Sequence, residues 1–333
     1  MRRHTVILGA GATIATIPNG DKNGNKSSVM NGLIDRLNLN DVLRNVKLST
    51  PSTNLEDIYS ELYSKPEYKN VVKELEKRIY TYFASLELPD YPTIYDMLVL
   101  SLTDKDAIAT FNWDPLLIQA YIRCCRLTTN LPHIFCLHGN VAVGYCKEHN
   151  EFGALNAVCP KCYNFFPPTK LLYPVEEKDY NGDKYIKNCW EATEQCIEES
   201  YMLTIFGYSA PSSDKEAVSL LKKAWGNLND RQLEEVSVID IISEDEMLNK
   251  WIDFIYSHHY KYTSSFFDSY LGMFPRRTCE TIFATFNMCL PADNRRGFKE
   301  KMSWDDVEKL IQPLINEETK TPNGKNYPFS YNR

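Results

Sequence analysis

The chain has 333 residues, of which 43% are hydrophobic and 24% charged, and its formal net charge is −7. This hydrophobic fraction is enough for a packed core and excludes a disordered or fibrous protein. The negative charge argues against broad binding to nucleic acid or to an anionic membrane. The apolar run after Arg3 is broken by Gly9, too early for a secretory signal, and no stretch is long enough for a membrane helix. We therefore expect a cytoplasmic protein with reduced cysteines.

The predicted elements alternate between strands and helices along the chain. Residues 4–8 are expected to form a buried strand, and residues 20–92 a helical insertion or crossover after it. Further strands are expected at 106–111, 133–137, 202–206 and 236–242, with helices at 93–103, 115–125 and 214–225. Strands and helices at this spacing predict βαβ units and a parallel sheet. The fold class is therefore α/β, a Rossmann-like parallel sheet flanked by helices.

A glycine turn, Gly9-Ala10-Gly11, follows the first strand directly. Glycine lets the backbone approach a phosphate group, and the helix that follows directs its N–H groups at the anion. Two glycines after a strand also occur as a tight turn without a ligand. Both interpretations stay open on this motif alone.

Polar residues follow two further predicted strands. Asn112 and Asp114 come after the strand at 106–111, and His138 follows the strand at 133–137. Functional residues of open α/β sheets gather at the carboxyl ends of strands. His138 could be a general base near neutral pH or a structural residue of its loop. Asn112 and Asp114 could hydrogen-bond a ribose and an amide, or cap the helix that begins at Pro115.

Two pairs of metal-ligating residues stand close together, Cys146-x2-His149 and Cys159-Pro160-Lys161-Cys162. Two such pairs separated by a short loop are what a tetrahedral zinc site requires. Because four protein ligands leave no open coordination position, the zinc would be structural. The alternative is a coincidence of loop cysteines. Residues 141–166 are therefore predicted to form a small zinc-ribbon-like module.

The order of these motifs resembles the sirtuin family, whose pattern runs Gly-Ala-Gly, Gln-Asn-Ile-Asp, His-Gly, two zinc knuckles and Gly-Thr-Ser. The matching residues here are Gly9-Ala10-Gly11-Ala12-Thr13, Asn112-Trp113-Asp114, His138-Gly139, the two zinc pairs and Gly207-Tyr208-Ser209. Ile241-Ile242-Ser243-Glu244 falls where the family's last strand meets the adenosine ribose. The resemblance covers about residues 1–250 apart from the helical insertion.

The resemblance implies that the chain binds NAD⁺ and uses it as a substrate. Asn112 would contact the nicotinamide ribose and position a nucleophile, and His138 would be the base acting on a ribose hydroxyl. Asp114 would hydrogen-bond the carboxamide. The glycine turn would hold the pyrophosphate, Ser209 a phosphate or ribose, and Ser243 would lie near the adenosine. The implied cofactor-binding residues are Gly9, Ala10, Gly11, Thr13, Asp114, Gly207, Ser209 and Ser243.

One departure from the family concerns the segment after the glycine turn. Protein-deacylating sirtuins continue with Ile-Pro-Asp-Phe-Arg, whereas Ile17-Pro18 is followed here by Asn19-Gly20-Asp21. In the family the aromatic residue shields the reactive sugar carbon from water, so its loss implies hydrolysis at that carbon. Together with Asp114-Pro115 and the loop at 167–174, the pattern looks more like the bacterial sirtuin-like proteins of antiphage defence.

The resemblance therefore predicts an NAD⁺ glycohydrolase that depletes NAD⁺ in infected bacteria. One alternative is a protein deacylase or ADP-ribosyl transferase, which would need a peptide groove between the zinc module and the sheet. Another is a non-catalytic sensor of NAD⁺ or ADP-ribose, which would need neither Asn112 nor His138. Residues 1–250 are expected to form the catalytic domain and 251–333 a helical C-terminal extension. We also expect a homo-oligomer and activation by a partner, such as an ATPase or another defence protein.

Overall fold

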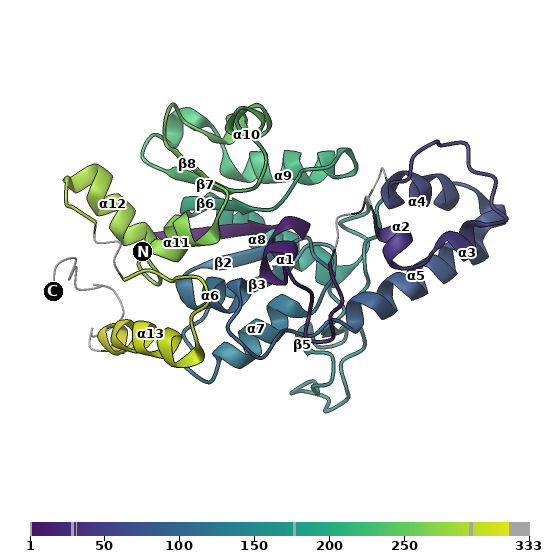
Figure 1. The fold of residues 1–333 in the computed structure, drawn as a ribbon, viewed down its shortest axis with the longest axis horizontal. Coiled ribbons are helices and arrows are strands. Elements are labelled where there is room, and N and C mark those ends of the chain that lie inside the picture. Colours follow the sequence, from purple (N-terminus) through teal and green to yellow (C-terminus); the bar gives the residue numbers. More distant parts are fainter. Residues whose placement is uncertain (1, 28–29, 31, 176–177, 293–295, 320–333) are drawn as a thin grey trace.

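Six parallel strands form the central sheet of the protein (Figure 1). The structure is a computed structural model that describes residues 2–27, 30, 32–175, 178–292 and 296–319. In spatial order the strands are β3 (His133–Cys136), β2 (Ala107–Thr110), β1 (Arg3–Leu8), β6 (Ser200–Phe206), β7 (Glu235–Ile239) and β8 (Tyr260–Thr263). The chain places β2 and β3 on one side of β1 and the later strands on the other, as in doubly wound folds.

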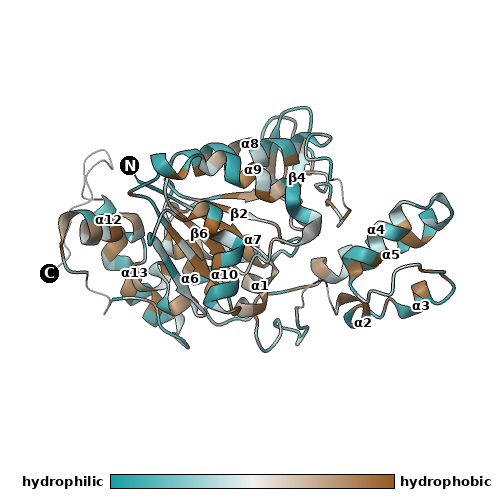
Figure 2. Ribbon diagram, turned by 90° about the horizontal axis from the view of Figure 1, so that it is seen from above, coloured by the Kyte–Doolittle hydropathy of each residue, from teal (hydrophilic) through white to brown (hydrophobic). Residues whose placement is uncertain are grey.

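Helices cover both faces of the sheet, and β1 shows why they must. Val6 and Leu8 point into one apolar core, whereas Ile7 points into the other. Because successive side chains of a strand point to opposite faces, an apolar strand has to be covered on both sides. The first face is covered by α1 (Ala10–Thr16), α6 (Ile94–Ser101), α7 (Leu116–Cys124) and α13 (Trp304–Thr319), and the second by α8 (Lys184–Glu198), α9 (Lys215–Trp225) and α10 (Glu244–Trp251). Figure 2 shows the apolar residues concentrated on the sheet between these helices.

A helical insertion between α1 and α6 projects from the sheet (Figure 1). It contains α2 (Leu33–Arg36), α3 (Asn40–Leu43), α4 (Leu55–Tyr63) and α5 (Lys69–Ala84). Its apolar core is continuous with one core of the sheet. Phe83 of α5 contacts Trp113 edge to face, with ring centroids 5.6 Å apart. The insertion is thereby held against the residues that follow β2.

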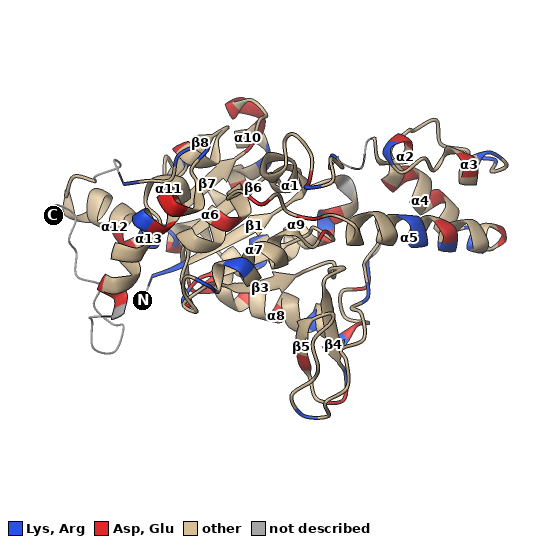
Figure 3. Cartoon of the chain, turned by 60° about the horizontal axis from the view of Figure 1, so that its bottom comes forward, with Lys and Arg blue, Asp and Glu red and all other residues tan. Residues whose placement is uncertain are grey.

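A two-stranded antiparallel sheet carries the expected metal ligands. It consists of β4 (Val143–Cys146) and β5 (Glu151–Ala154), which project away from the central sheet (Figure 3). The fold class predicted from the sequence, with its parallel sheet, helical insertion and small ribbon-like module, is confirmed. None of the helices in the described part of the chain is long and apolar enough to cross a membrane.

The C-terminal segment differs from the sequence prediction in one respect. A helical extension is predicted from residue 251, but β8 is the sixth strand of the sheet and pairs with β7, with Val236 opposite Tyr260. Beyond it lie α11 (Tyr270–Met273), α12 (Thr278–Met288) and α13. Arg276 is buried and forms an ion pair with Glu318, which joins α13 to the segment between α11 and α12. Residues 320–333 of the predicted extension lie outside the described residues.

Candidate active site

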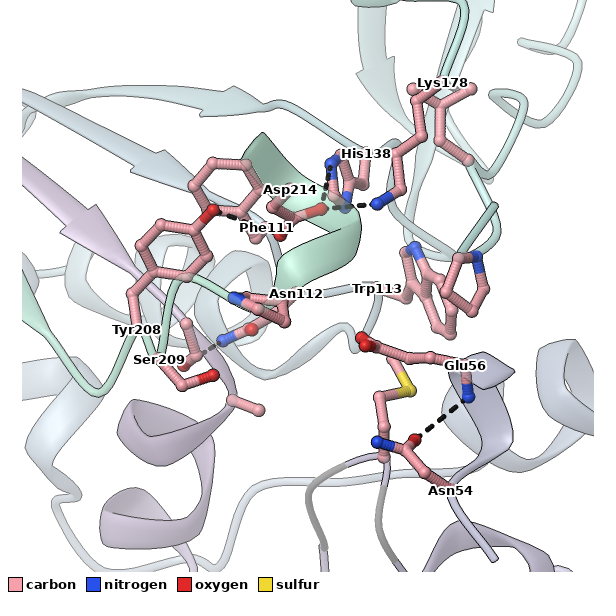
Figure 4. Close-up of a pocket in the computed structure, with 16 residues that line it drawn as sticks. Asn54, Glu56, Phe111, Asn112, Trp113, His138, Lys178, Tyr208, Ser209 and Asp214 are labelled. Atoms are coloured by element: carbon pink, nitrogen blue, oxygen red, sulfur yellow. Dashed lines mark hydrogen bonds and ion pairs between the residues drawn. The ribbon is translucent and has the colours of Figure 1, made fainter. Parts of the chain in front are cut away.

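A cavity of about 330 Å³ opens at the carboxyl ends of the strands (Figure 4). His138, Asn112, Gly9 and Ser209 all line it, because they follow β3, β2, β1 and β6, which are neighbours in the sheet. The chain adds β2 and β3 on one side of β1 and then crosses to the other side of β1, where it adds β6, β7 and β8. The point between β1 and β6 is therefore the topological switch point of the sheet. Open α/β sheets bind their ligands at this switch point.

The glycine turn after β1 packs directly against the turn after β6. The N–H of Gly11 donates to the C=O of Gly207 at 2.9 Å. A Cβ on Gly207, whose φ is +60°, would lie 2.3 Å from the backbone nitrogen of Ala12, so only glycine fits there. Gly9 and Ala10 line the cavity, whereas Gly11 and Gly207 do not. Two of the predicted cofactor-binding glycines therefore hold the two turns together.

Asn112 connects the end of β2 to the glycine turn. Its Nδ2 donates to the C=O of Gly9 at 2.9 Å and to Thr13 Oγ1 and Tyr95 OH at 3.1 Å each. Because the carbonyl oxygen of Gly9 can only accept a hydrogen bond, the Asn112 side-chain atom that contacts it must be the amide nitrogen. The amide oxygen, Oδ1, takes no part in this network. Asn112 lines the cavity and Thr13 does not. The Oδ1 atom is therefore the part of Asn112 that a ligand can use.

Asp114 is buried, and its carboxylate accepts hydrogen bonds from other residues of the chain. One carboxylate oxygen accepts the Thr13 hydroxyl at 2.7 Å, and the other accepts the N–H of Leu116 at 3.0 Å. The second contact caps the first turn of α7, which was one of the two sequence interpretations. Burial raises the pKa of this carboxyl. Asp114 does not line the cavity, so its predicted contact with a carboxamide stays a prediction.

His138 lines the cavity with an unpartnered nitrogen. Its Nε2 is buried and has no hydrogen-bond partner in the described part of the chain, and Asp214 Oδ1 lies 3.9 Å away. Burial lowers the pKa of His138 to about 4, and the negative charge of Asp214 opposes this shift only in part. The ring packs edge-on against Phe111, with centroids 4.8 Å apart. A neutral imidazole in this position can accept a proton, and Asp214 would stabilise the resulting cation.

Two charged residues beside His138 are not identified by any sequence motif. Lys178 and Asp214 form an ion pair, and both side chains are buried. Tyr208 donates its hydroxyl to the second oxygen of Asp214 at 3.1 Å. Burial, followed by the charge of Asp214, raises the pKa of Tyr208. Lys178 and Asp214 lie far apart in the sequence, so only the folded chain shows that they meet.

The two predicted serines lie in different places. Ser209 follows β6 and lines the cavity. Ser243 is exposed at the start of α10, where its Oγ donates to Glu246 at 3.1 Å and accepts the Glu246 N–H at 3.3 Å. The strand before it ends at Ile239 rather than at residue 242, and the Asp240 carboxylate accepts the next backbone N–H at 2.7 Å. Ser243 therefore has a capping role and does not line the cavity.

The four predicted metal ligands lie together at the tip of the ribbon-like module. One ligand atom from each of Cys146, His149, Cys159 and Cys162 lies within 4.8 Å of all the others. Cys146 Sγ is 3.4 Å from His149 Nδ1 and 3.9 Å from Cys162 Sγ. Tetrahedral zinc with Zn–S bonds of about 2.3 Å separates two sulfur ligands by roughly 3.8 Å. The donor set and its spacing therefore fit a structural zinc ion.

The fold and the cavity define a doubly wound, Rossmann-like α/β protein with its candidate site at the topological switch point. Neither a protein-family model nor a curated protein sequence matches the chain. Solved structures of Sir2 proteins are similar to it. A mutant Sir2 homologue in complex with ADP-ribose is 12% identical, with 96% of this chain and 95% of that chain covered and a TM-score of 0.40. A Sir2 homologue in complex with NAD is 14% identical, with 84% and 89% covered and a TM-score of 0.39. Similarity at this level does not assign a function.

Proposed function

We propose that the chain is an NAD⁺ glycohydrolase, which cleaves the N-glycosidic bond of NAD⁺ and releases nicotinamide and ADP-ribose. One observation carries the proposal: a neutral His138, whose Nε2 has no hydrogen-bond partner among the described residues, lines the same cavity as Asn112 at the switch point of the sheet. A cavity of this kind can hold a nucleotide and place a base beside its sugar.

In this proposal NAD⁺ lies across the turns at the sheet edge. The backbone of Gly9 and Ala10 and the hydroxyl of Ser209 contact the pyrophosphate, and Asn112 Oδ1 accepts a hydroxyl of the nicotinamide ribose. His138 Nε2 accepts a proton from a ribose hydroxyl, and Asp214, 3.9 Å away, stabilises the imidazolium. The remaining residues implied by the sirtuin resemblance, Gly11, Thr13, Asp114, Gly207 and Ser243, do not line the cavity; the first four support those that do.

The segment after α1 supports hydrolysis rather than transfer to another acceptor. The Asp21 carboxylate accepts the backbone N–H groups of Asn23, Asn25 and Glu87 at 2.9, 2.7 and 3.1 Å, which folds this segment into a closed turn. None of these residues lines the cavity, and residues 17–31 contain no aromatic residue. This segment therefore supplies no aromatic ring that could cover the sugar carbon, as the family's aromatic residue does.

One observation favours the alternative of a protein deacylase. An apolar groove of about 320 Å³ lies between β3 and the ribbon-like module, with Ile134 on one side and Phe152 on the other. An extended peptide could bind there. The groove shares no lining residue with the cavity that contains His138, however. A lysine of the peptide would have to leave the groove to reach the proposed NAD⁺ site.

For the cell, we propose that NAD⁺ depletion by this chain is an effector step of bacterial antiphage defence in the cytoplasm. Because an NAD⁺ glycohydrolase that is always active would kill its host, the chain would need an activating event. Assembly into a homo-oligomer or contact with a partner ATPase or another defence protein would supply it. Zinc in the ribbon-like module would have a structural role only.

Nicotinamide release by the purified chain tests the proposal. NAD⁺ is added with and without an acetylated peptide, and nicotinamide and ADP-ribose are quantified. The glycohydrolase releases both without the peptide, whereas a deacylase releases nicotinamide only when the peptide is present. A sensor binds NAD⁺ and releases nothing. Release that requires the peptide, or binding without release, would contradict the proposal.

A further inference from the structure

The helical insertion contributes polar residues to the cavity. Asn54 and Glu56 lie at the start of α4 and line the same cavity as Asn112 and His138. Asn54 Oδ1 accepts the N–H of Glu56 at 3.0 Å, which fixes the first turn of α4 and the backbone that carries the Glu56 side chain. In Figure 4 the Glu56 carboxylate extends from α4 toward Asn112. The insertion therefore brings a carboxylate to a site otherwise built mainly from the sheet and its loops.

Among the described residues that line the cavity, Glu56 is the charged residue whose charge is not balanced by an ion pair. The other two charged lining residues, Lys178 and Asp214, neutralise each other as a buried ion pair. His138 is neutral because burial lowers its pKa to about 4. Glu56 forms no ion pair with any described residue. A cavity with this surplus negative charge suits a substrate whose sugar becomes positively charged as its bond breaks.

The surroundings of Glu56 also favour a carboxylate that accepts a proton. Burial, and after it the charge of Asp214, raise the pKa of Glu56, while Lys178 and the Ser213 hydroxyl oppose the change. A raised pKa makes a carboxylate a better base near neutral pH. His138 and Glu56 lie on different walls of the cavity (Figure 4), so the two groups can act on different atoms of one substrate.

We propose that Glu56 is a further catalytic residue of this site and holds the water that attacks the sugar. The proposal rests on the NAD⁺ glycohydrolase function proposed above. When the bond between C1′ and the nicotinamide nitrogen breaks, its electron pair leaves with nicotinamide and the sugar becomes an oxocarbenium ion. The water oxygen then bonds to C1′, while one water proton passes to the Glu56 carboxylate and from there to solvent. The products are nicotinamide, ADP-ribose and one proton.

The test compares Glu56→Gln with Asp57→Asn, a matched control on the same turn of α4 with an exposed side chain. Each substitution removes one negative charge from the first turn, so any effect through the helix dipole is the same. Two rates are measured with enzyme in excess over NAD⁺. One is hydrolysis to ADP-ribose, and the other is incorporation of labelled nicotinamide into NAD⁺, which requires cleavage of the C1′–N bond but no water.

We expect Glu56→Gln to lower hydrolysis by ~10²-fold, the usual scale for loss of a general base, and to lower nicotinamide exchange much less, because exchange loses the charge of Glu56 but needs no base for water. Retained exchange also shows that the variant folds and binds NAD⁺. Asp57→Asn should change neither rate. Unchanged hydrolysis in Glu56→Gln would overturn this proposal and leave the glycohydrolase function intact. Equal losses of both rates would also overturn it, because Glu56 would then act on bond cleavage or binding. A wild-type chain without either reaction would refute the proposed function itself, and this inference with it.

Discussion

Replacing His138 by alanine separates a catalytic role of this residue from a structural one. Because burial lowers its pKa to about 4, fewer than about one side chain in a thousand is protonated at pH 7. The imidazole is therefore unprotonated over the whole physiological range. Loss of a general base costs about 10²- to 10⁴-fold in turnover. His138→Ala should lower nicotinamide release by at least ~10²-fold, which corresponds to about 2.7 kcal/mol in the activation barrier.

The same burial predicts how stability depends on pH. The pKa of His138 is about 4 in the folded chain, and near the usual histidine value of about 6.5 when the chain is unfolded. The unfolded chain therefore binds more protons between these values, and stability falls as the pH drops from 6.5 toward 4. At pH 5 the loss due to His138 is about 2 kcal/mol. His4, whose pKa burial lowers to about 3, contributes equally in wild type and variant, so their difference isolates His138.

Urea unfolding at pH 7.5 and pH 5.0, together with nicotinamide release at pH 7.5, completes this test on single preparations. His138→Ala should lose less stability than wild type between the two pH values. Full activity of the folded variant at pH 7.5 would refute the catalytic reasoning. An unchanged loss of stability on acidification would refute the argument from burial.

Three further predictions concern the metal and the packing behind the cavity. Protein purified without chelator should contain about one zinc per chain, and Cys159→Ser should lower the melting temperature and solubility; metal-free wild type would contradict this. Asp114→Ala should lower the free energy of unfolding in urea by about 1–3 kcal/mol, because it removes a buried acceptor of two hydrogen bonds; unchanged stability would show that these contacts contribute nothing. Gly207→Ala should lower the free energy of unfolding by over about 2 kcal/mol, because its Cβ would clash with Ala12. The control Gly24→Ala, at a position with positive φ but open space, should lower it by about 1 kcal/mol. Similar melting temperatures of the two variants would refute the clash.

The sheet could be predicted from sequence largely because its inner strands are buried on both faces. β1, β2, β6 and β7 are short, mostly apolar runs that end at glycine or at polar residues, a pattern that needs no knowledge of distant contacts. β8 could not be predicted in this way. It is a half-buried Tyr-Lys-Tyr-Thr segment at the edge of the sheet, and its strand conformation depends on pairing with β7.

The candidate site was predictable only where it follows strands of the sheet. Asn112 and His138 occupy such positions, and the structure brings both to one cavity. Glu56, Lys178 and Asp214 come from the helical insertion, a loop and the start of a helix. Their meeting depends on how these segments pack against one another, for which the local sequence holds no signal. Asp114 and Ser243 match positions of the family motif but do not line the cavity. Their side chains instead accept backbone N–H groups at the starts of α7 and α10.

A crystal structure of His138→Ala with NAD⁺ tests the central claim most directly, because a slow variant keeps its substrate intact. The account predicts intact NAD⁺ at the switch point, with its pyrophosphate beside Gly9 and Ala10 and the nicotinamide ribose within hydrogen-bond distance of Asn112 Oδ1. Its C1′ atom should face the side of the cavity formed by Glu56. An empty cavity at saturating NAD⁺, or NAD⁺ bound in another part of the chain, would contradict the account.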